Sequence, residues 1–348
     1  MVKIFKPLVI LKHRLARATL IVERMFDVVI PRRGLGNPEI DPYFGHATPT
    51  TVILRGRVLS RKVKKNVKAV EADASLWTNF KAMIALFNTR EMSNIRITCL
   101  GHETRSDEEG YFELILPRTK NQTGWVEHKV CFGDGDDCAD LAALLPTSEA
   151  EFGIISDIDD TLIKTEAWSL SRNLWNSLTG NAHSRYVFPD AIQLIQTLHK
   201  QINPVFYVSS SPWNLHGFLT EIFDRAGLVR GPKFLRILGI SESKFITGKR
   251  GHHKGAAIDE ILSANPNLTF ILMGDTGQHD AFVYHEVLMR HPERIRQIIL
   301  RAPQPGLSKE SQICVDKIKA TKTPIFVGET YKPLLDEKLS LAFYQKPE

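Results

Sequence analysis

The sequence predicts an α/β protein whose larger domain is a parallel sheet with helices on both faces. After residue 150, apolar runs of strand length alternate with segments of helical periodicity. The runs are continuously apolar, as expected for strands that are buried on both faces of a sheet. The chain has 348 residues, 43% of them hydrophobic, which suffices for about two domains with sizeable cores.

The expected strands of this domain cover residues 152–156, 204–208, 268–273 and 297–300. Helical segments separate or follow them, at residues 191–200, 215–226, 254–263 and 281–291. We assign residues 150–303 to this domain and residues 304–348 to an extension that completes it. Sheets of this kind bind their ligands at the carboxyl ends of the strands.

Two smaller parts are expected before this domain. Residues 1–36 carry apolar side chains alternately three and four positions apart, which is typical of an amphipathic helix. They also hold eight Lys/Arg and two Asp/Glu, and so the whole net charge of +6. This helix either packs on the rest of the protein, lies on an anionic membrane surface or forms a dimer contact. Residues 43–148 contain short alternating strands, typical of a small β-sandwich, with a helical insertion near residues 69–87.

The cysteines and the hydropathy of the sequence indicate the cellular compartment in which the protein is expected. The four cysteines have irregular spacing, which indicates neither a disulfide framework nor a zinc site: Cys99, Cys131, Cys138 and Cys314. Because no disulfide pattern is evident, we expect the protein to be in a reducing compartment. We therefore expect a cytoplasmic protein with peripheral membrane contact. No stretch reaches the ~20 apolar residues that a membrane-spanning helix needs.

Polar side chains follow the expected strands where each strand ends. Asp157, Asp159 and Thr161 follow the first strand, and Ser209 and Ser210 follow the second. A later helix begins near Lys254, while Asp275 ends the third strand and Asp280 comes five residues later. Carboxylates at close quarters repel one another unless a cation joins them, and oxygen ligands suit Mg²⁺.

This set of residues predicts phosphoryl transfer through an aspartyl-phosphate. Asp157 is the expected nucleophile, and Asp159 is placed to protonate the leaving alkoxide and then to activate water. Asp157, Asp159 and Asp275 are the expected Mg²⁺ ligands, with Asp280 supporting them. Thr161, Ser209, Ser210 and Lys254 are expected to hold the substrate phosphate.

Each of these residues also has a purely structural interpretation. The D-x-D-x-T motif occurs in exposed turns, Ser209 is suited to cap a helix, and lysines such as Lys254 are common on surfaces. Their order along the chain, each at a strand end or a helix start, favours the functional interpretation.

Four motifs resemble those of the haloacid-dehalogenase-like phosphatases. The segments SDIDDT (156–161), FYVSSSPW (206–213) and GDTGQHD (274–280) are similar to the actin-patch-associated phosphatidate phosphatase family, as is PERI (292–295). The resemblance covers residues 150–303 and implies a Rossmann-like fold and an Mg²⁺-dependent phosphatase acting on phosphatidate. Residues 56–58 and 107–112 resemble the β-domain of bacterial-type members.

We therefore expect hydrolysis of phosphatidate to diacylglycerol and phosphate at an anionic membrane surface, with nucleic acid disfavoured as a partner. The alternatives are a phosphatase of nucleic-acid ends or phosphoproteins, and an adaptor with an idle site. Neither residues 161–209 nor residues 211–254 have room for a folded cap, which predicts an open catalytic edge. Trp168 and Trp175 are candidates for its apolar rim. The sequence leaves open which of Ser209, Ser210 and Ser211 binds phosphate, what the β-domain binds, and how many subunits assemble.

Overall fold

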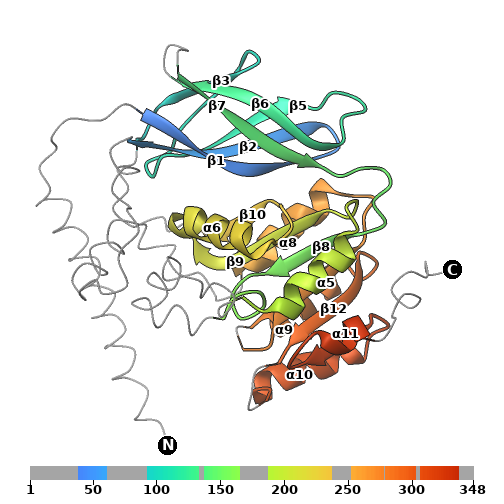
Figure 1. The fold of residues 1–348 in the computed structure, drawn as a ribbon. Coiled ribbons are helices and arrows are strands. Elements are labelled where there is room, and N and C mark those ends of the chain that lie inside the picture. The colour runs from blue at the N-terminus through green and yellow to red at the C-terminus, as the bar shows by residue number, and fades with distance from the viewer. Residues whose placement is uncertain are drawn as a thin grey trace, which may run out of the picture. The chain divides into compact units, whose positions relative to one another are not determined.

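The computed structural model describes residues 38–60, 92–132, 137–164, 187–236, 252–277, 279–302 and 306–336. The N-terminal helix, the helical insertion and the apolar rim expected above lie outside these residues. The described strands form two separate sheets (Figure 1). None of the described helices is long and apolar enough to span a membrane.

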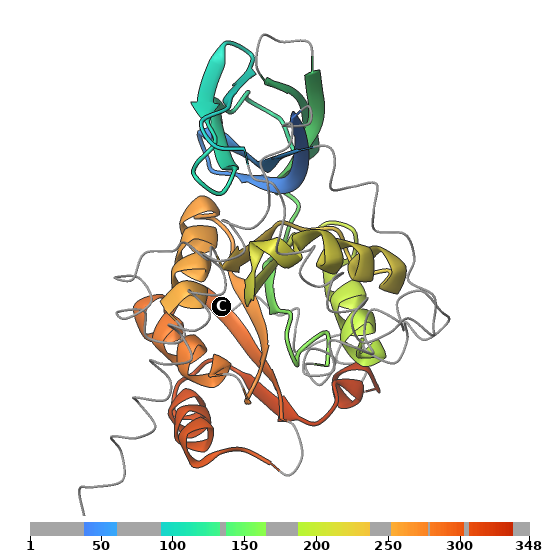
Figure 2. The same ribbon diagram turned by 90° about the vertical axis from the view of Figure 1, so that its left-hand side faces the viewer.

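The first sheet has seven strands and takes up the N-terminal part of the described chain. Its strands are β1 (Pro38–Ala47), β2 (Thr51–Ser60), β3 (Arg96–Cys99), β4 (His102–Arg105), β5 (Tyr111–Pro117), β6 (Gly124–Phe132) and β7 (Asp137–Leu145). They are hydrogen-bonded in the order β4-β3-β6-β7-β1-β2-β5, and only β1 and β7 pair in parallel. The two ends of this order, β4 and β5, contact each other, and Figure 2 shows the sheet curled around its core.

This β-rich segment folds as its sequence pattern suggests. In β5, buried and exposed side chains alternate along the strand, as the two-residue period of a strand requires. The buried residues include Leu54, Ile97 and Leu114. The strands follow one continuous order, so the two-sheet sandwich stays a prediction that they do not confirm.

The expectation about the cysteines is wrong in one respect. Cys131 and Cys138 form a disulfide, while Cys99 and Cys314 are free and buried. Cys131 lies in β6 directly opposite Cys138 in β7. The two thiols therefore meet because the hairpin pairs these positions, a register that irregular spacing in the sequence did not reveal.

The second sheet has six strands, all parallel. They are β8 (Gly153–Asp157), β9 (Val205–Pro212), β10 (Lys233–Arg236), β11 (Phe270–Asp275), β12 (Ile295–Arg301) and β13 (Ile325–Gly328). Their order is β10-β9-β8-β11-β12-β13. The central strand β8 is buried at every position, which explains its continuous apolar run.

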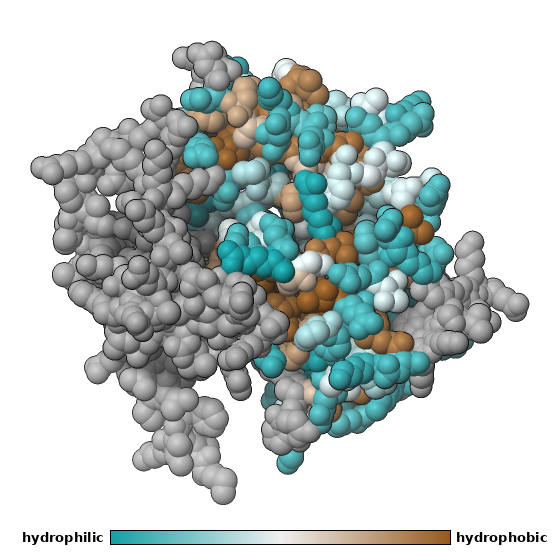
Figure 3. Space-filling model, in the orientation of Figure 1, coloured by the Kyte–Doolittle hydropathy of each residue, from teal (hydrophilic) through white to brown (hydrophobic). Residues whose placement is uncertain are grey.

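Helices cover both faces of this sheet, which confirms the predicted α/β class. One face carries α5 (Pro189–His199), α6 (His216–Ala226) and α11 (Lys332–Asp336). The other carries α8 (His252–Ala264), α9 (Asp280–Arg290) and α10 (Lys309–Lys319). Successive strand residues serve opposite faces: Ile154 packs in the first core and Ile155 in the second. On the face drawn in Figure 3, hydrophilic residues dominate the described surface and hydrophobic ones form small patches.

Candidate active site

The parallel register brings three functional strand ends to one edge of the sheet. Strand β8 lies between β9 and β11, with Asp157 opposite Val208 and Ser156 opposite Met273. Asp157 ends β8, Asp275 ends β11, and Ser209 follows Val208 directly. These residues therefore meet at the carboxyl edge, as the sequence predicted.

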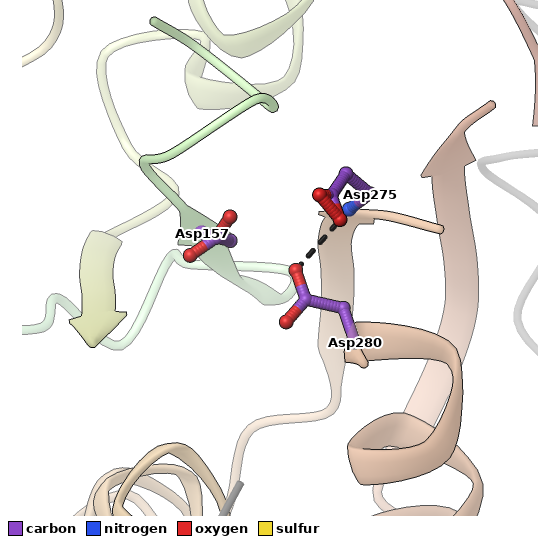
Figure 4. A group of neighbouring side chains, drawn as sticks. All are labelled: Asp157, Asp275 and Asp280. Carbon is purple, nitrogen blue, oxygen red and sulfur yellow. Dashed lines mark hydrogen bonds between the residues drawn. The ribbon is translucent and has the colours of Figure 1, made fainter. Parts of the chain in front are cut away.

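Three aspartates form the centre of this edge. Asp157, Asp275 and Asp280 each offer a carboxylate oxygen, and these oxygens lie within 4.8 Å of one another (Figure 4). Asp280 is the first residue of α9, and its Oδ2 accepts a hydrogen bond from the backbone N–H of Asp275 at 3.2 Å. All three side chains are fully buried. Asp280, expected only as a supporting acid, thus lies within the cluster itself.

Lys254 enters the cluster from the first turn of α8. Its Nζ lies 2.7 Å from Asp157 Oδ1 and 2.6 Å from Asp280 Oδ1. Burial favours loss of its proton, but the two carboxylates outweigh burial and raise the pKa of Lys254. The lysine is therefore cationic and fixed between two acids, which excludes the surface interpretation of this residue.

Asp157 is held in an environment that opposes its negative charge. Burial raises the pKa of Asp157, and the neighbouring Asp280 raises it further, while Lys254 acts in the opposite direction. Thr161 Oγ1 donates a hydrogen bond to Asp157 Oδ2 at 3.2 Å. The carboxylate is thus oriented by one hydroxyl and one ammonium group. Because its environment opposes negative charge, a further cation beside it would be stabilising.

Asp159 lies two residues beyond the strand and is held by serines. Its Oδ2 accepts hydrogen bonds from Ser209 Oγ at 2.6 Å and Ser211 Oγ at 3.0 Å. Its Oδ1 is buried and has no hydrogen-bond partner among the described residues. Burial raises the pKa of Asp159, and the two serine hydrogen bonds partly counter it. A carboxyl group in this setting is suited to hold a proton and to release it to a neighbouring oxygen.

The expected phosphate ligands lie at this edge but differ in what they contact. Thr161 bonds Asp157 and Ser209 bonds Asp159, whereas Ser210 is exposed. Their role toward phosphate stays a prediction, as does that of Asp159 toward a metal. The sequence left open whether Ser211 binds phosphate. In the structure, its hydroxyl donates to the same carboxylate, that of Asp159, as the hydroxyl of Ser209.

Two buried tyrosines that the sequence did not single out fix the end of β11. Tyr284 donates its phenolic O–H to the carbonyl of Met273 at 2.7 Å, and Tyr331 donates to the carbonyl of Gly274 at 3.2 Å. A Cβ on Gly274 would lie 2.7 Å from Asp280 Oδ2 and 2.8 Å from the Tyr284 ring. Glycine is therefore required before Asp275. In the sequence, the pair Gly274-Asp275 was the signal that could have indicated this position. Tyr331 lies 57 residues from Gly274, so no local sequence pattern connects the two residues.

The donor set fits a hard divalent cation. Among the described residues, the edge holds one buried ammonium, that of Lys254, and four buried carboxyl groups, those of Asp157, Asp159, Asp275 and Asp280. Burial of several like charges is unfavourable unless a counter-ion joins them. Carboxylate oxygens are the ligands that Mg²⁺ and Ca²⁺ prefer.

Comparisons with known proteins match the segment that contains these site residues. Residues 152–302 match the family model "Phosphatidate phosphatase APP1, catalytic domain". The chain is 29% identical over 157 residues to the phosphatidate phosphatase APP1 of Saccharomyces cerevisiae, covering 45% of this chain and 27% of that protein. It is 24% identical over 202 residues to an uncharacterized protein of Schizosaccharomyces pombe, covering 56% of this chain and 33% of that protein.

The chain thus spans about a third or less of the curated relatives that it matches. Among solved structures, that of an apo phosphoserine phosphatase aligns with 56% of this chain and 100% of its own length, at 14% identity and a TM-score of 0.32. For residues 152–302, the family model and the yeast relative agree with the family predicted from the motifs.

Proposed function

We propose that this chain, whose residues 152–302 belong to the family of the phosphatidate phosphatase APP1 catalytic domain, is a phosphatase that hydrolyses phosphatidate to diacylglycerol and phosphate. The observation that carries the proposal is the buried Lys254 held between Asp157 and Asp280, with Asp159 on serine hydroxyls beside them. This arrangement supplies a fixed nucleophile, a counter-charge and a separate acid. The substrate is proposed from the name of the yeast relative.

In the first step, a carboxylate oxygen of Asp157 attacks the phosphorus atom. A P–O bond forms to Asp157 as the bond from phosphorus to the ester oxygen breaks. Asp159 gives its proton to the leaving alkoxide, which departs as the hydroxyl group of diacylglycerol. Lys254 keeps the reacting carboxylate oriented and offsets charge on the phosphoryl oxygens.

In the second step, Asp159 reverses its role. Its carboxylate takes a proton from a water molecule, whose oxygen attacks the phosphorus atom and breaks the bond to Asp157. Inorganic phosphate leaves and both aspartates return to their starting states. Asp157, Asp275 and Asp280 would hold Mg²⁺, which supplies positive charge that stabilises the transferring phosphoryl group.

Phosphate release tests this proposal. Short-chain phosphatidate, a 5′-phosphorylated oligonucleotide and a phosphopeptide are offered with Mg²⁺ and with EDTA. We expect Mg²⁺-dependent release from the lipid, abolished by Asp157→Asn because an amide is not an anionic nucleophile. The matched control Asp160→Asn changes the next acid along the loop and keeps the activity. Release from the oligonucleotide or the phosphopeptide alone would overturn the lipid assignment, and no release from any ester would favour the idle adaptor.

The basic N-terminal segment suggests the partner. Residues 1–36 carry eight Lys/Arg against two Asp/Glu, whereas residues 37–150 carry 14 against 16 and residues 151–348 carry 23 against 21. Basic residues next to an apolar stripe favour an anionic lipid surface. We propose that this segment brings the enzyme to the membrane that holds its substrate.

A further inference from the structure

A cavity of about 620 Å³ lies beside α8, the helix that carries Lys254. Its walls come from β1, β2, β4 and β5 of the first sheet and from β10, η3 (Trp213–Leu215) and α8 of the second sheet's domain. This volume lies within the range of small-molecule sites, roughly 300–1,000 Å³. None of the residues that line it belongs to the carboxylate cluster.

Two chain segments contribute residues both to the cavity wall and to the candidate active site. His253 lines it and directly precedes Lys254, whose Nζ contacts Asp157. Trp213 lines it as well and follows Ser211, whose hydroxyl contacts Asp159. Two of the chain segments that hold the catalytic carboxylates therefore continue into the wall of the cavity.

The wall is rich in aromatic side chains. Tyr43 and Trp213 stack at 4.7 Å between ring centroids with an interplanar angle of 13°, and Tyr111 lies 6.2 Å from Trp213. Phe112 and Phe234 also line the space. Such surfaces favour an apolar chain over water.

The charged groups of the wall already have partners: Arg105 donates to the backbone oxygen of Asn94 at 3.0 Å, and Asp107 Oδ1 accepts two backbone N–H groups at 2.9 Å. Arg55 donates to Glu113 at 2.7 Å and to Glu260 at 2.6 Å, and it is buried. Two carboxylates thus balance this guanidinium, so it is not a cation held for a second phosphate. Matched charges and aromatic rings together favour an uncharged, apolar occupant.

We infer that this cavity receives an acyl chain of the lipid whose phosphate is hydrolysed at Asp157. The inference rests on the proposed function and extends it, because it names the surface that distinguishes a lipid phosphate from a small soluble ester. The aromatic wall binds the chain and the carboxylate edge acts on the headgroup.

Filling the cavity tests the assignment. Ala256 lines it from an exposed position on α8, so Ala256→Phe occupies its space with little risk to the core. Ser263→Phe is the matched control, on the same helix at an exposed position outside the cavity. The readout is the ratio of kcat/KM for dioctanoyl phosphatidate to kcat/KM for glycerol 3-phosphate.

We expect Ala256→Phe to lower this ratio ~10-fold or more, since loss of a single buried methylene already changes discrimination ~10–200-fold. Ser263→Phe should leave the ratio at the wild-type value. An unchanged ratio in Ala256→Phe, or equal losses on both esters, would overturn the acyl site while leaving the phosphatase proposal intact. A wild-type enzyme that releases no phosphate from phosphatidate would overturn both. Preference for a nucleoside monophosphate, lost in Ala256→Phe, would replace the acyl chain with a stacked base.

A binding measurement gives an independent readout. In the Asp157→Asn background, phosphatidate with a dibrominated acyl chain is titrated while tryptophan fluorescence is followed. Bromine quenches on contact, so we expect quenching that decreases when Trp213→Phe is added to the background. Quenching that is identical with and without Trp213 would show that the chain lies elsewhere.

Discussion

Replacing Lys254 by methionine is the sharpest test of the site's electrostatics. The lysine Nζ lies 2.7 Å and 2.6 Å from two buried carboxylates. At an effective dielectric constant near 20, each contact is worth ~6 kcal/mol before the cost of desolvation is subtracted. Removal of one partner from such buried pairs typically costs about 3–5 kcal/mol. We expect Lys254→Met to lower the free energy of unfolding by about 3–5 kcal/mol in EDTA near neutral pH.

The loss should depend on pH in a defined direction. Without the ammonium, burial and the neighbouring Asp280 hold the pKa of Asp157 still further above its value in the unfolded chain. The folded state then binds more protons than the unfolded state, so stability is kept at low pH and lost as pH rises. The deficit of Lys254→Met should therefore be larger near pH 8 than near pH 5, and Mg²⁺ should reduce it.

Urea unfolding of the two proteins at both pH values, with EDTA and with Mg²⁺, measures these effects. The double variant Lys254→Met/Asp280→Asn should be more stable than Lys254→Met, since it removes one of the two opposed charges. A deficit below ~1 kcal/mol, or one that is the same at both pH values, would refute the assigned electrostatics.

Lys233 provides the matched control because it is the other lysine that is buried among the described residues. Its Nζ donates to Thr220 Oγ1 at 3.1 Å, and burial lowers the pKa of Lys233 to about 8. A folded pKa below that of the unfolded lysine disfavours the folded state below pH 8, by about 3 kcal/mol, and this penalty fades as pH rises toward 10.5. Lys233→Met should therefore cause no loss of stability near neutral pH, in contrast to Lys254→Met.

Three further predictions concern the proposed acid Asp159, the buried Tyr331 that bonds the end of β11, and the N-terminal segment. Asp159→Asn should slow hydrolysis of an alkyl phosphate by ~10²–10⁴-fold and that of p-nitrophenyl phosphate much less, because a good leaving group needs little acid help; equal losses on both would contradict its role as acid. Tyr331→Phe should lower the free energy of urea unfolding by about 1 kcal/mol through loss of its hydrogen bond to Gly274, and an unchanged midpoint would show that the bond is not stabilising. Deletion of residues 2–36 should weaken binding to anionic vesicles, since each Lys/Arg near the surface contributes about 1 kcal/mol, and should spare hydrolysis of a soluble ester; binding insensitive to the deletion would mean that the segment packs internally.

The parts of the fold that the sequence predicted are those with a continuous local signal. Strands β8 and β11 are buried at every position, and β9 and β12 contain buried apolar runs at residues 205–208 and 298–300. The candidate site residues lie at or near the carboxyl ends of these strands, which meet at one edge of the sheet. Sequence order alone was therefore enough to bring Asp157, Ser209 and Asp275 together.

Other features depend on register or on distant packing and have no local signal. Strand β13 is short and only partly buried, so its sequence does not stand out from a loop. The pairing of Cys131 with Cys138 depends on the hairpin register, and the stacking of Tyr43 on Trp213 joins residues 170 positions apart. Asp280 was underrated because a helix start after a loop does not reveal that its side chain turns back toward the strand end.

Charge distinguishes this sheet edge from an ordinary protein core. In the part of the chain that the structure describes, four buried carboxyl groups share the edge with one buried ammonium, an excess of acidic groups that stability alone does not favour. The phosphate of a substrate is itself an anion, and the same carboxylates would repel it unless positive charge is added first. A divalent cation that binds before the ester would meet both conditions, because it would lower the free energy of the folded state and convert the edge into an anion acceptor. The groups that cost stability are those that the proposed chemistry requires, as is expected where function rather than folding has selected the residues.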